Sequence, residues 1–202
     1  LMIRILHLTD FHLDTRTLKD WNNFYKDALF ENLIELNIEN PIDFIVFTGD
    51  LIDKAGKDFK GATKGFEEFK ANVILPILEL LKLEVSRFII APGNHDINRF
   101  ADSKIDENGL KSTLTTSQEV IDFMEEAEKS ESYRYIERIK EYKDFEFSLY
   151  ENIADEKLHS LFEFSLRYKN VAGKSVGISS LNSAWRCYND DDFGNLLIGE
   201  NQ

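Results

Sequence analysis

The stretch that most constrains the fold is residues 43–53, which reads Asp-Phe-Ile-Val-Phe-Thr-Gly-Asp-Leu-Ile-Asp. Residues 44–48 are rich in apolar, β-branched and aromatic side chains, a pattern that predicts a strand buried on both faces. The strand ends abruptly at Gly49-Asp50. Because α/β folds bind ligands where parallel strands end, we expect Asp50 to lie at the edge of a sheet, in a ligand site.

The first half of the chain alternates between predicted strands and predicted helices. The strands are residues 3–9, 44–48 and 87–91, the helices are residues 20–38 and 64–82, and a mobile loop is expected over 54–64. Asp20 suits the N-cap of the first helix, and Pro76 predicts a kink or break in the second. This order predicts an α/β fold with a mostly parallel sheet, right-handed crossovers and helices outside.

The second half breaks this alternation. Residues 102–114 are expected to form a loop, Thr116 and Glu119 match a capping box that opens a helix to about residue 129, and another helix is expected over 131–150. Residues 102–157 hold 16 acidic against 8 basic side chains, so we interpret 101–158 as an acidic helical insertion. A solvated insertion is favoured over a cap that covers the site.

A hairpin is expected after the insertion. Residues 162–168 alternate between apolar and polar side chains, residues 176–181 form the partner strand, and Gly173 lies in the turn between them. The last residues, from Glu200, are expected to begin a helix.

Composition limits the partners and the compartment. The formal net charge of −13 disfavours a broad electrostatic grip on nucleic acid, but it does not argue against a small site for divalent cations. Cys187 is the only cysteine, so we expect a buried thiol and a reducing compartment, the cytoplasm. No signal peptide is visible, and no apolar stretch is long enough to span a membrane.

The chemistry lies where the three strands of the first half end. They end in Asp10-x-His12, Gly49-Asp50-x-x-Asp53 and Gly93-Asn94-His95-Asp96. Parallel strands bring their carboxyl ends together, so these groups are expected to share one crevice. Carboxylate, imidazole and amide ligands suit Mn²⁺, Fe or Zn²⁺, and one carboxylate, Asp50, can bridge two ions that activate water and clamp a phosphoryl group.

These motifs resemble those of the calcineurin-like metallophosphoesterase superfamily, and residues 182–200 resemble its cyclic-nucleotide-phosphodiesterase-like branch more weakly. The resemblance implies a layered α/β sandwich over residues 2–202. It implies that Asp10 and His12 hold one ion, Asn94 the other and Asp50 both, with Mn²⁺ as the expected metal and Fe or Zn²⁺ as alternatives. It also implies that His95 contacts phosphate and protonates the leaving oxygen, that Asp96 orients His95, and that a metal-bound hydroxide attacks phosphorus in line.

The sequence departs from the family pattern in its second half. The family's lone histidine and Gly-His-x-His motif do not occur, and His159, the only histidine after His95, is expected at the surface. We therefore expect a domain truncated at its C-terminus, which binds metal weakly and catalyses poorly. Asp53 is expected to cap a turn or to hydrogen-bond behind the ligands.

Four further side chains are of types that can take part in such a site. His7 is expected to be a hydrogen-bonded residue within the first strand rather than a ligand. Arg99 is expected at the surface, with contact to a substrate phosphate as the alternative. Trp185 and Arg186 are expected to be a packed aromatic residue and a solvated charge, unless they line the crevice.

Three functions remain open from the sequence. The first is a two-metal phosphodiesterase or phosphomonoesterase for a nucleotide or another small phosphoester. The second, less favoured because of the acidity, is a nuclease that resembles the metallophosphoesterase subunit of double-strand-break repair. The third is a phosphoesterase-like interaction module without its ions. The oligomeric state stays open.

Overall fold

The computed structural model describes residues 2–189, 192 and 196–198, so the helix expected from Glu200 lies outside the described residues. The strands are β1 (Ile5–Leu8), β2 (Phe44–Thr48), β3 (Phe88–Ala91), β4 (Glu156–His159), β5 (Glu163–Val171) and β6 (Lys174–Leu181). The α-helices are α1 (Thr15–Asp20), α2 (Lys26–Glu39), α3 (Ala62–Phe69), α4 (Leu75–Leu81), α5 (Lys104–Thr113), α6 (Ser117–Ser130) and α7 (Lys140–Leu149). Within these residues, every helix is too short or too polar to cross a lipid bilayer.

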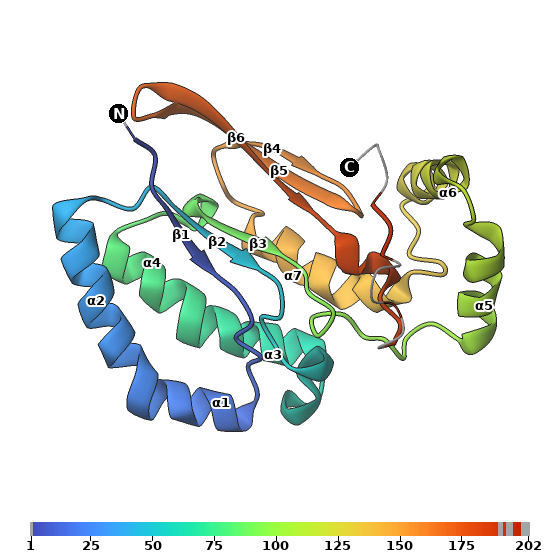
Figure 1. Ribbon diagram of the computed structural model, residues 1–202, viewed down its shortest axis with the longest axis horizontal. Coiled ribbons are helices and arrows are strands. Elements are labelled where there is room, and N and C mark those ends of the chain that lie inside the picture. The colour runs from blue at the N-terminus through green and yellow to red at the C-terminus, as the bar shows by residue number, and fades with distance from the viewer. Residues whose placement is uncertain (1, 190–191, 193–195, 199–202) are drawn as a thin grey trace.

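A parallel sheet with the strand order β1-β2-β3 carries the site, as predicted. Helices α1 to α4 pack against one of its faces (Figure 1). Phe47 and Phe88 of the sheet are buried there, and the ring of Phe47 lies 5.2 Å from that of Phe69 on α3. The alternation of apolar strands with amphipathic helices therefore gave the correct α/β arrangement.

The first crossover helix begins earlier than predicted. Its N-cap is Asp14, whose carboxylate accepts a hydrogen bond from the backbone N–H of Thr17 at 2.6 Å. Asp20, the predicted N-cap, is the last residue of α1, and a π-helical turn, Trp21–Tyr25, connects α1 to α2. Both aspartates are suitable caps, and only Asp14 directly follows the loop that leaves β1.

Pro76 breaks the second crossover helix, as predicted. A π-helical turn, Lys70–Ile74, separates α3 from α4, and Pro76 lies in the first turn of α4. Because proline has no N–H, the carbonyl of Asn72 lacks its helical donor. That carbonyl instead accepts a hydrogen bond from the indole N–H of Trp21 at 3.0 Å. This hydrogen bond links the turn between α3 and α4 to the turn between α1 and α2.

Residues between β2 and α3, where a mobile loop was predicted, contain a 3-10 segment, Lys54–Phe59, that is kinked at Ala55 and Gly56. The backbone N–H of Ala55 donates to the carbonyl of His95 at 2.8 Å, and Gly56 is buried. This segment therefore lies against the loop after β3, beside the strand ends.

The second sheet is antiparallel, with the strand order β4-β5-β6. The predicted hairpin is β5 and β6, and β4 was not predicted because its four residues alternate too little to suggest a strand. Apolar side chains of β5 pack into the core; they are Phe164, Leu166 and Tyr168. The hydroxyl of Ser180 on β6 donates to the carbonyl of Ile90 on β3 at 2.7 Å, which joins the two sheets.

His159 is not at the surface, contrary to the prediction. Its side chain is only 9% exposed, its Nε2 lies 2.9 Å from Oε2 of Glu146, and its ring stacks on Phe147. Burial lowers the pKa of His159, although Glu146 opposes this effect. The prediction for His159 failed because strand β4 was not predicted, and this strand places the His159 side chain against α7.

Residues 101–158, which we interpret as an insertion, contain helices, but the bounds of these helices differ from the prediction. Residues 104–113 form α5, capped by the side chain of Ser103, where a loop was expected. The capping box of Thr116 and Glu119 opens α6 as predicted. The third helix, expected over 131–150, is shorter: a 3-10 turn, Glu137–Ile139, precedes α7. A second hydrophobic cluster, centred on the fully buried Trp185, packs this part of the chain.

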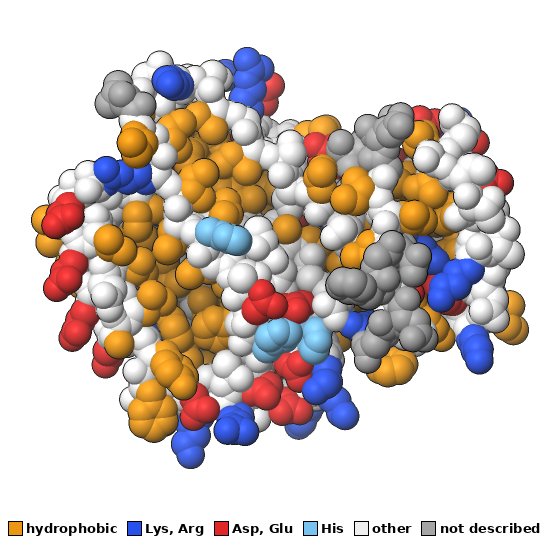
Figure 2. Space-filling model, in the orientation of Figure 1, with side chains coloured by type: hydrophobic (Ala, Val, Ile, Leu, Met, Phe, Trp, Pro, Cys, Tyr) orange, Lys and Arg blue, Asp and Glu red, His pale blue; other side chains and the backbone are white. Residues whose placement is uncertain are grey.

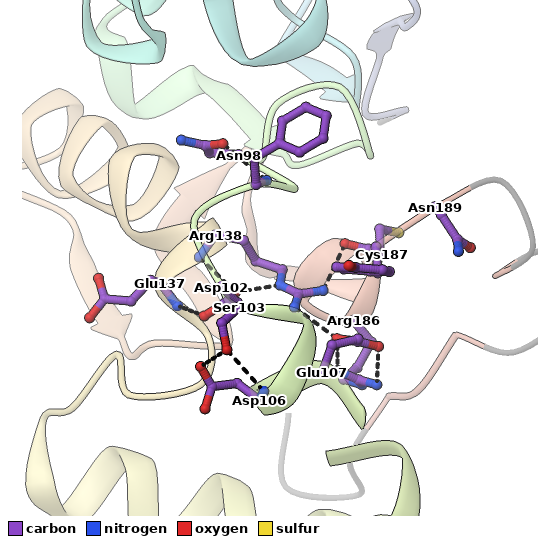
Figure 3. Close-up of polar contacts among 12 residues, drawn as sticks. Asn98, Asp102, Ser103, Asp106, Glu107, Glu137, Arg138, Arg186, Cys187 and Asn189 are labelled. Carbon is purple, nitrogen blue, oxygen red and sulfur yellow. Dashed lines mark hydrogen bonds and ion pairs between the residues drawn. The ribbon is translucent and has the colours of Figure 1, made fainter. Parts of the chain in front are cut away.

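A buried ionic network ties the insertion to the segment that follows β6 (Figure 3). Arg138 donates to Asp102 at 2.6 Å, to Glu107 at 2.8 Å and to the carbonyl of Cys187 at 3.1 Å. Arg186 binds both oxygens of Glu107 at 3.0 Å, so it is buried and paired rather than solvated. Burial raises the pKa of Glu107, but the two guanidinium groups outweigh this and hold the pKa below its usual range.

Because this network is buried, we expect the loss of its arginine to lower the free energy of unfolding much more than the loss of an exposed lysine. Arg138→Leu leaves the buried carboxylate of Asp102 without its cation and removes one of the two guanidinium partners of Glu107, so we expect a loss of about 3–5 kcal/mol in the free energy of unfolding. Lys140→Ala removes an exposed ion pair with Asp144 and is expected to cost no more than about 0.5 kcal/mol. Urea unfolding measures both, and equal effects would contradict the role of the network.

Candidate metal centre

The chain segments that follow β1 and β2 stay paired beyond the ends of the strands. The backbone N–H groups of Asp10, His12 and Leu13 donate to the carbonyls of Gly49, Asp50 and Leu51 at 3.1, 2.8 and 3.0 Å. This pairing brings the first two predicted motifs side by side at the carboxyl edge of the sheet, where α/β folds bind ligands.

Three of the predicted ligands have a left-handed backbone. The φ angles are 54° for Asp10, 49° for His12 and 56° for Asp50. Non-glycine residues adopt this conformation rarely, and such strain is concentrated at functional sites, where the surrounding structure imposes it. The backbone pairing of the two segments imposes it here.

The side chains of these residues face one another. Nε2 of His12 lies 3.8 Å from Oδ1 of Asp10 and 3.5 Å from Oδ2 of Asp50. The three groups could together hold one metal ion. Two carboxylates and one imidazole fit a divalent first-row metal such as Mn²⁺. Histidine and acidic side chains gather on this face of the molecule (Figure 2).

The third motif closes against Asp50. The backbone N–H of His95 donates to Oδ1 of Asp50 at 2.9 Å. A Cβ atom on Gly93 would lie 2.1 Å from the same oxygen, so only glycine permits this approach. Asn94 lies between these residues, and its carbonyl accepts a hydrogen bond from Nε of Arg99 at 3.3 Å. The metal-ligand role of its side chain stays a prediction.

Arg99 is half-buried and contacts the loop that carries the third motif.

His7 is exposed on β1, and its Nε2 lies 2.6 Å from the hydroxyl of Thr48, in agreement with the prediction of a hydrogen-bonded residue within the first strand. Cys187 is buried, as predicted, and burial raises the pKa of its thiol to about 11.

His95 is oriented by Asp53, not by Asp96 as predicted. Nδ1 of His95 lies 2.7 Å from Oδ1 of Asp53. Burial raises the pKa of Asp53, but hydrogen bonds with His95 and Lys54 outweigh this and lower it overall. The motif Asp50-x-x-Asp53 already offered Asp53 as a candidate partner for His95. Asp96 was predicted instead because it is adjacent to His95 in the sequence.

Asp96 is fully buried and holds two of the segments together. Its oxygens accept hydrogen bonds from the N–H groups of Ile52 at 3.0 Å and Gly93 at 2.8 Å. Burial raises the pKa of Asp96 to about 7, although these N–H groups oppose the shift. Its role in this structure is therefore to support the loops.

Sequence reasoning also missed Thr9. Its hydroxyl lies 2.6 Å from Oδ2 of Asp10 and 3.1 Å from the carbonyl of Thr48. A hydroxyl beside a ligand carboxylate fixes the orientation of that carboxylate. The spacing of the motifs does not point to this threonine, which directly follows β1.

The fold and the site together define an α/β protein with a cluster of potential metal ligands and a carboxylate-bound imidazole at the carboxyl edge of its parallel sheet. A family model described as calcineurin-like phosphoesterase matches residues 3–192. The chain belongs to this family of metal-dependent phosphoesterases. No curated protein matches the sequence significantly.

The contact between Gly93 and Asp50 generates a prediction about metal affinity. In Gly93→Ala the new methyl group clashes with both the carboxylate and the backbone nitrogen of Asp50, so the carboxylate and the loop after β3 must shift. We expect Mn²⁺ to bind about 10–100-fold more weakly, as when groups that support a ligand are removed. Isothermal titration calorimetry measures the affinity. Gly109→Ala is the control, because its Cβ meets nothing within 4 Å. Wild-type affinity in Gly93→Ala would contradict the assignment.

Proposed function

We propose that this chain hydrolyses a phosphodiester or phosphomonoester at a dinuclear divalent-metal site. The observation that carries the proposal is the convergence of Asp10, His12 and Asp50, from two separate strand ends, on one point beside His95. Membership of the calcineurin-like phosphoesterase family supports the reaction class.

Asp10 and His12 would hold the first ion, Asn94 the second, and Asp50 both. Mn²⁺ is the proposed metal, because oxygen ligands predominate in this set, and Fe or Zn²⁺ are the alternatives. When bound, a pair of divalent ions supplies an activated water and neutralises the charge on the phosphoryl group. Asp50 suits the shared position, since it lies between the other two segments and contacts both.

His95 would act as the general acid that protonates the leaving oxygen. Its Nδ1 is held by Asp53, so Nε2 remains as the nitrogen that faces a substrate. The carboxylate fixes the orientation of the ring and stabilises the protonated imidazole. Asp53 therefore takes the positioning role that the sequence had given to Asp96.

The proposed substrate is a nucleotide or another small phosphoester. The net charge of −13 makes long nucleic acids the less favoured substrate. The weak resemblance of residues 182–200 to the cyclic-nucleotide-phosphodiesterase-like branch supports a diester. A cytoplasmic setting is proposed because the single cysteine, Cys187, is a buried free thiol.

The substrate class can be tested by assaying the protein with Mn²⁺ on three compounds. These are bis(p-nitrophenyl) phosphate, p-nitrophenyl phosphate and single-stranded DNA. We expect hydrolysis of at least one of the two small esters to exceed that of DNA. Preferential DNA cleavage would replace the proposal with a nuclease, and no metal-dependent hydrolysis of any of them would favour the interaction module.

The shared role of Asp50 gives a direct prediction. Asp50→Asn removes a ligand charge from both ions, and a loss of several kcal/mol in transition-state stabilisation corresponds to a rate lower by on the order of a thousandfold. Folding, measured by circular dichroism, is expected to be largely intact. Asp43→Asn, at the opposite end of the same strand, is the control. A near wild-type rate in Asp50→Asn would refute the assignment.

A further inference from the structure

A second set of potential metal ligands lies beside the first. It consists of His12, Asp53 and His95, whose ligand atoms all lie within 4.8 Å of one another. Oδ1 of Asp53 lies 2.7 Å from Nδ1 of His95 and 4.0 Å from Nδ1 of His12, and the two imidazole rings are 4.5 Å apart in an edge-to-face arrangement. Two histidines and one carboxylate therefore surround one point.

The composition of this set differs from that of the first. Asp10, His12 and Asp50 offer two carboxylates and one imidazole, whereas His12, Asp53 and His95 offer one carboxylate and two imidazoles. Nitrogen-rich sets favour Zn²⁺ over Mn²⁺, and three protein ligands with an open fourth position are a common zinc arrangement. The second set is thus better suited to zinc than the first.

The geometry needs only a small adjustment to accept the ion. Tetrahedral ligands about 2.0–2.1 Å from Zn²⁺ lie roughly 3.3 Å apart. Asp53 and His95 must therefore separate from 2.7 Å by about 0.6 Å, and His12 must approach Asp53 from 4.0 Å by about 0.7 Å. The side chains of His12, Asp53 and His95 are 38, 21 and 27% exposed, so the ion can reach them. An ion that binds Nδ1 of His95 requires the neutral tautomer with its proton on Nε2, and a protonated His95 releases one proton to solvent.

The two sets compete because both need His12. Its Nε2 faces Asp10 and Asp50, while its Nδ1 faces Asp53. A neutral imidazole has one nitrogen lone pair for a metal, and the other nitrogen carries the proton. His12 therefore serves one set at a time, and an ion in the second set also occupies His95.

We propose that Zn²⁺ binds to His12, Asp53 and His95 as a mononuclear site that excludes an ion from the set of Asp10, His12 and Asp50. Binding follows from the geometry alone. The consequence, that zinc bound there inhibits the phosphoesterase, rests on the proposed function, because a zinc-bound neutral imidazole is a far weaker acid than the imidazolium that would protonate a leaving group.

Cobalt absorption tests the binding without reference to activity. Co²⁺ replaces Zn²⁺ in tetrahedral sites and gives an intense visible band there, so it is titrated into the wild-type protein and four variants. We expect the band to persist in Asp10→Asn, to be lost in Asp53→Asn and in His95→Gln, and to be unchanged in the control His7→Gln. His7 is an exposed histidine on β1 that belongs to neither ligand set, and its Nε2 lies 2.6 Å from the hydroxyl of Thr48.

The opposite pattern overturns the proposal. A band that is lost in Asp10→Asn but retained in Asp53→Asn and His95→Gln would place the ion in the first set. Circular dichroism of each variant checks folding, and His95→Gln provides a second test if Asp53→Asn is unfolded. Mn²⁺-dependent activity of the wild-type protein is measured separately, so failure of the proposed function is distinguishable from failure of the zinc site.

Nitrogen chemical shifts identify the ligating atoms. Addition of Zn²⁺ to ¹⁵N-labelled protein is expected to shift Nδ1 of His12 and a ring nitrogen of His95. A shift of Nε2 of His12, with His95 unchanged, would overturn the proposal, because it would mean that zinc occupies the set with Asp10 and Asp50.

Discussion

The candidate metal centre depends on the buried carboxylate of Asp96. Its oxygens accept hydrogen bonds from Ile52 and Gly93, and so fasten the loop after β3 to the loop after β2. A buried carboxylate is stable only when such donors surround it, and the raised pKa of Asp96, about 7, reflects the burial. Once the two loops are fastened, the N–H of His95 points at Asp50 and Gly93 lies against it.

The remaining loop is held by backbone pairing. Residues 10–13 continue to hydrogen-bond to residues 49–51 after β1 and β2 have ended. The cost is an unfavourable left-handed backbone at Asp10, His12 and Asp50. The three side chains are turned toward one another as a result. The backbone pairing therefore brings the ligands together. Attraction among the ligands does not explain the cluster, because two of them, Asp10 and Asp50, are both carboxylates.

Much of this arrangement could be predicted from the sequence because it follows from local rules. Apolar, β-branched runs locate β1, β2 and β3, parallel strands bring their ends together, and Pro76 marks the helix break. The predictions that failed depended on contacts between distant residues. Asp14 and Asp20 are equally good caps by type, and only the path of the chain distinguishes them.

The same limit applies to individual side chains. Arg186 and His159 look like surface residues in the sequence, but they are buried against Glu107 and Glu146, more than ten residues away. The choice between Asp53 and Asp96 as the partner of His95 also needed coordinates, because both lie near the motif and only the turn at residues 93–96 decides which one faces the ring. Burial and pairing across the fold are not encoded in local spacing.

Residues 101–158 are connected by hydrogen bonds to the segment that leads out of the candidate metal centre. The N–H of Asn98 donates to the carbonyl of Arg138 at 2.9 Å, and Asp102 binds the side chain of the same arginine. The chain between His95 and α5 is therefore held at both ends, by Asp96 at the centre and by the buried ionic network at the insertion. Rigid support of this kind is what precise placement of ligands requires.

The central claim is that Asp10, His12 and Asp50 hold a divalent cation. Anomalous X-ray diffraction from crystals of the protein grown with Mn²⁺ tests it most directly. We expect an anomalous peak bonded to carboxylate oxygens of Asp10 and Asp50 and to Nε2 of His12. Manganese peaks elsewhere, with those three side chains unligated, would contradict it.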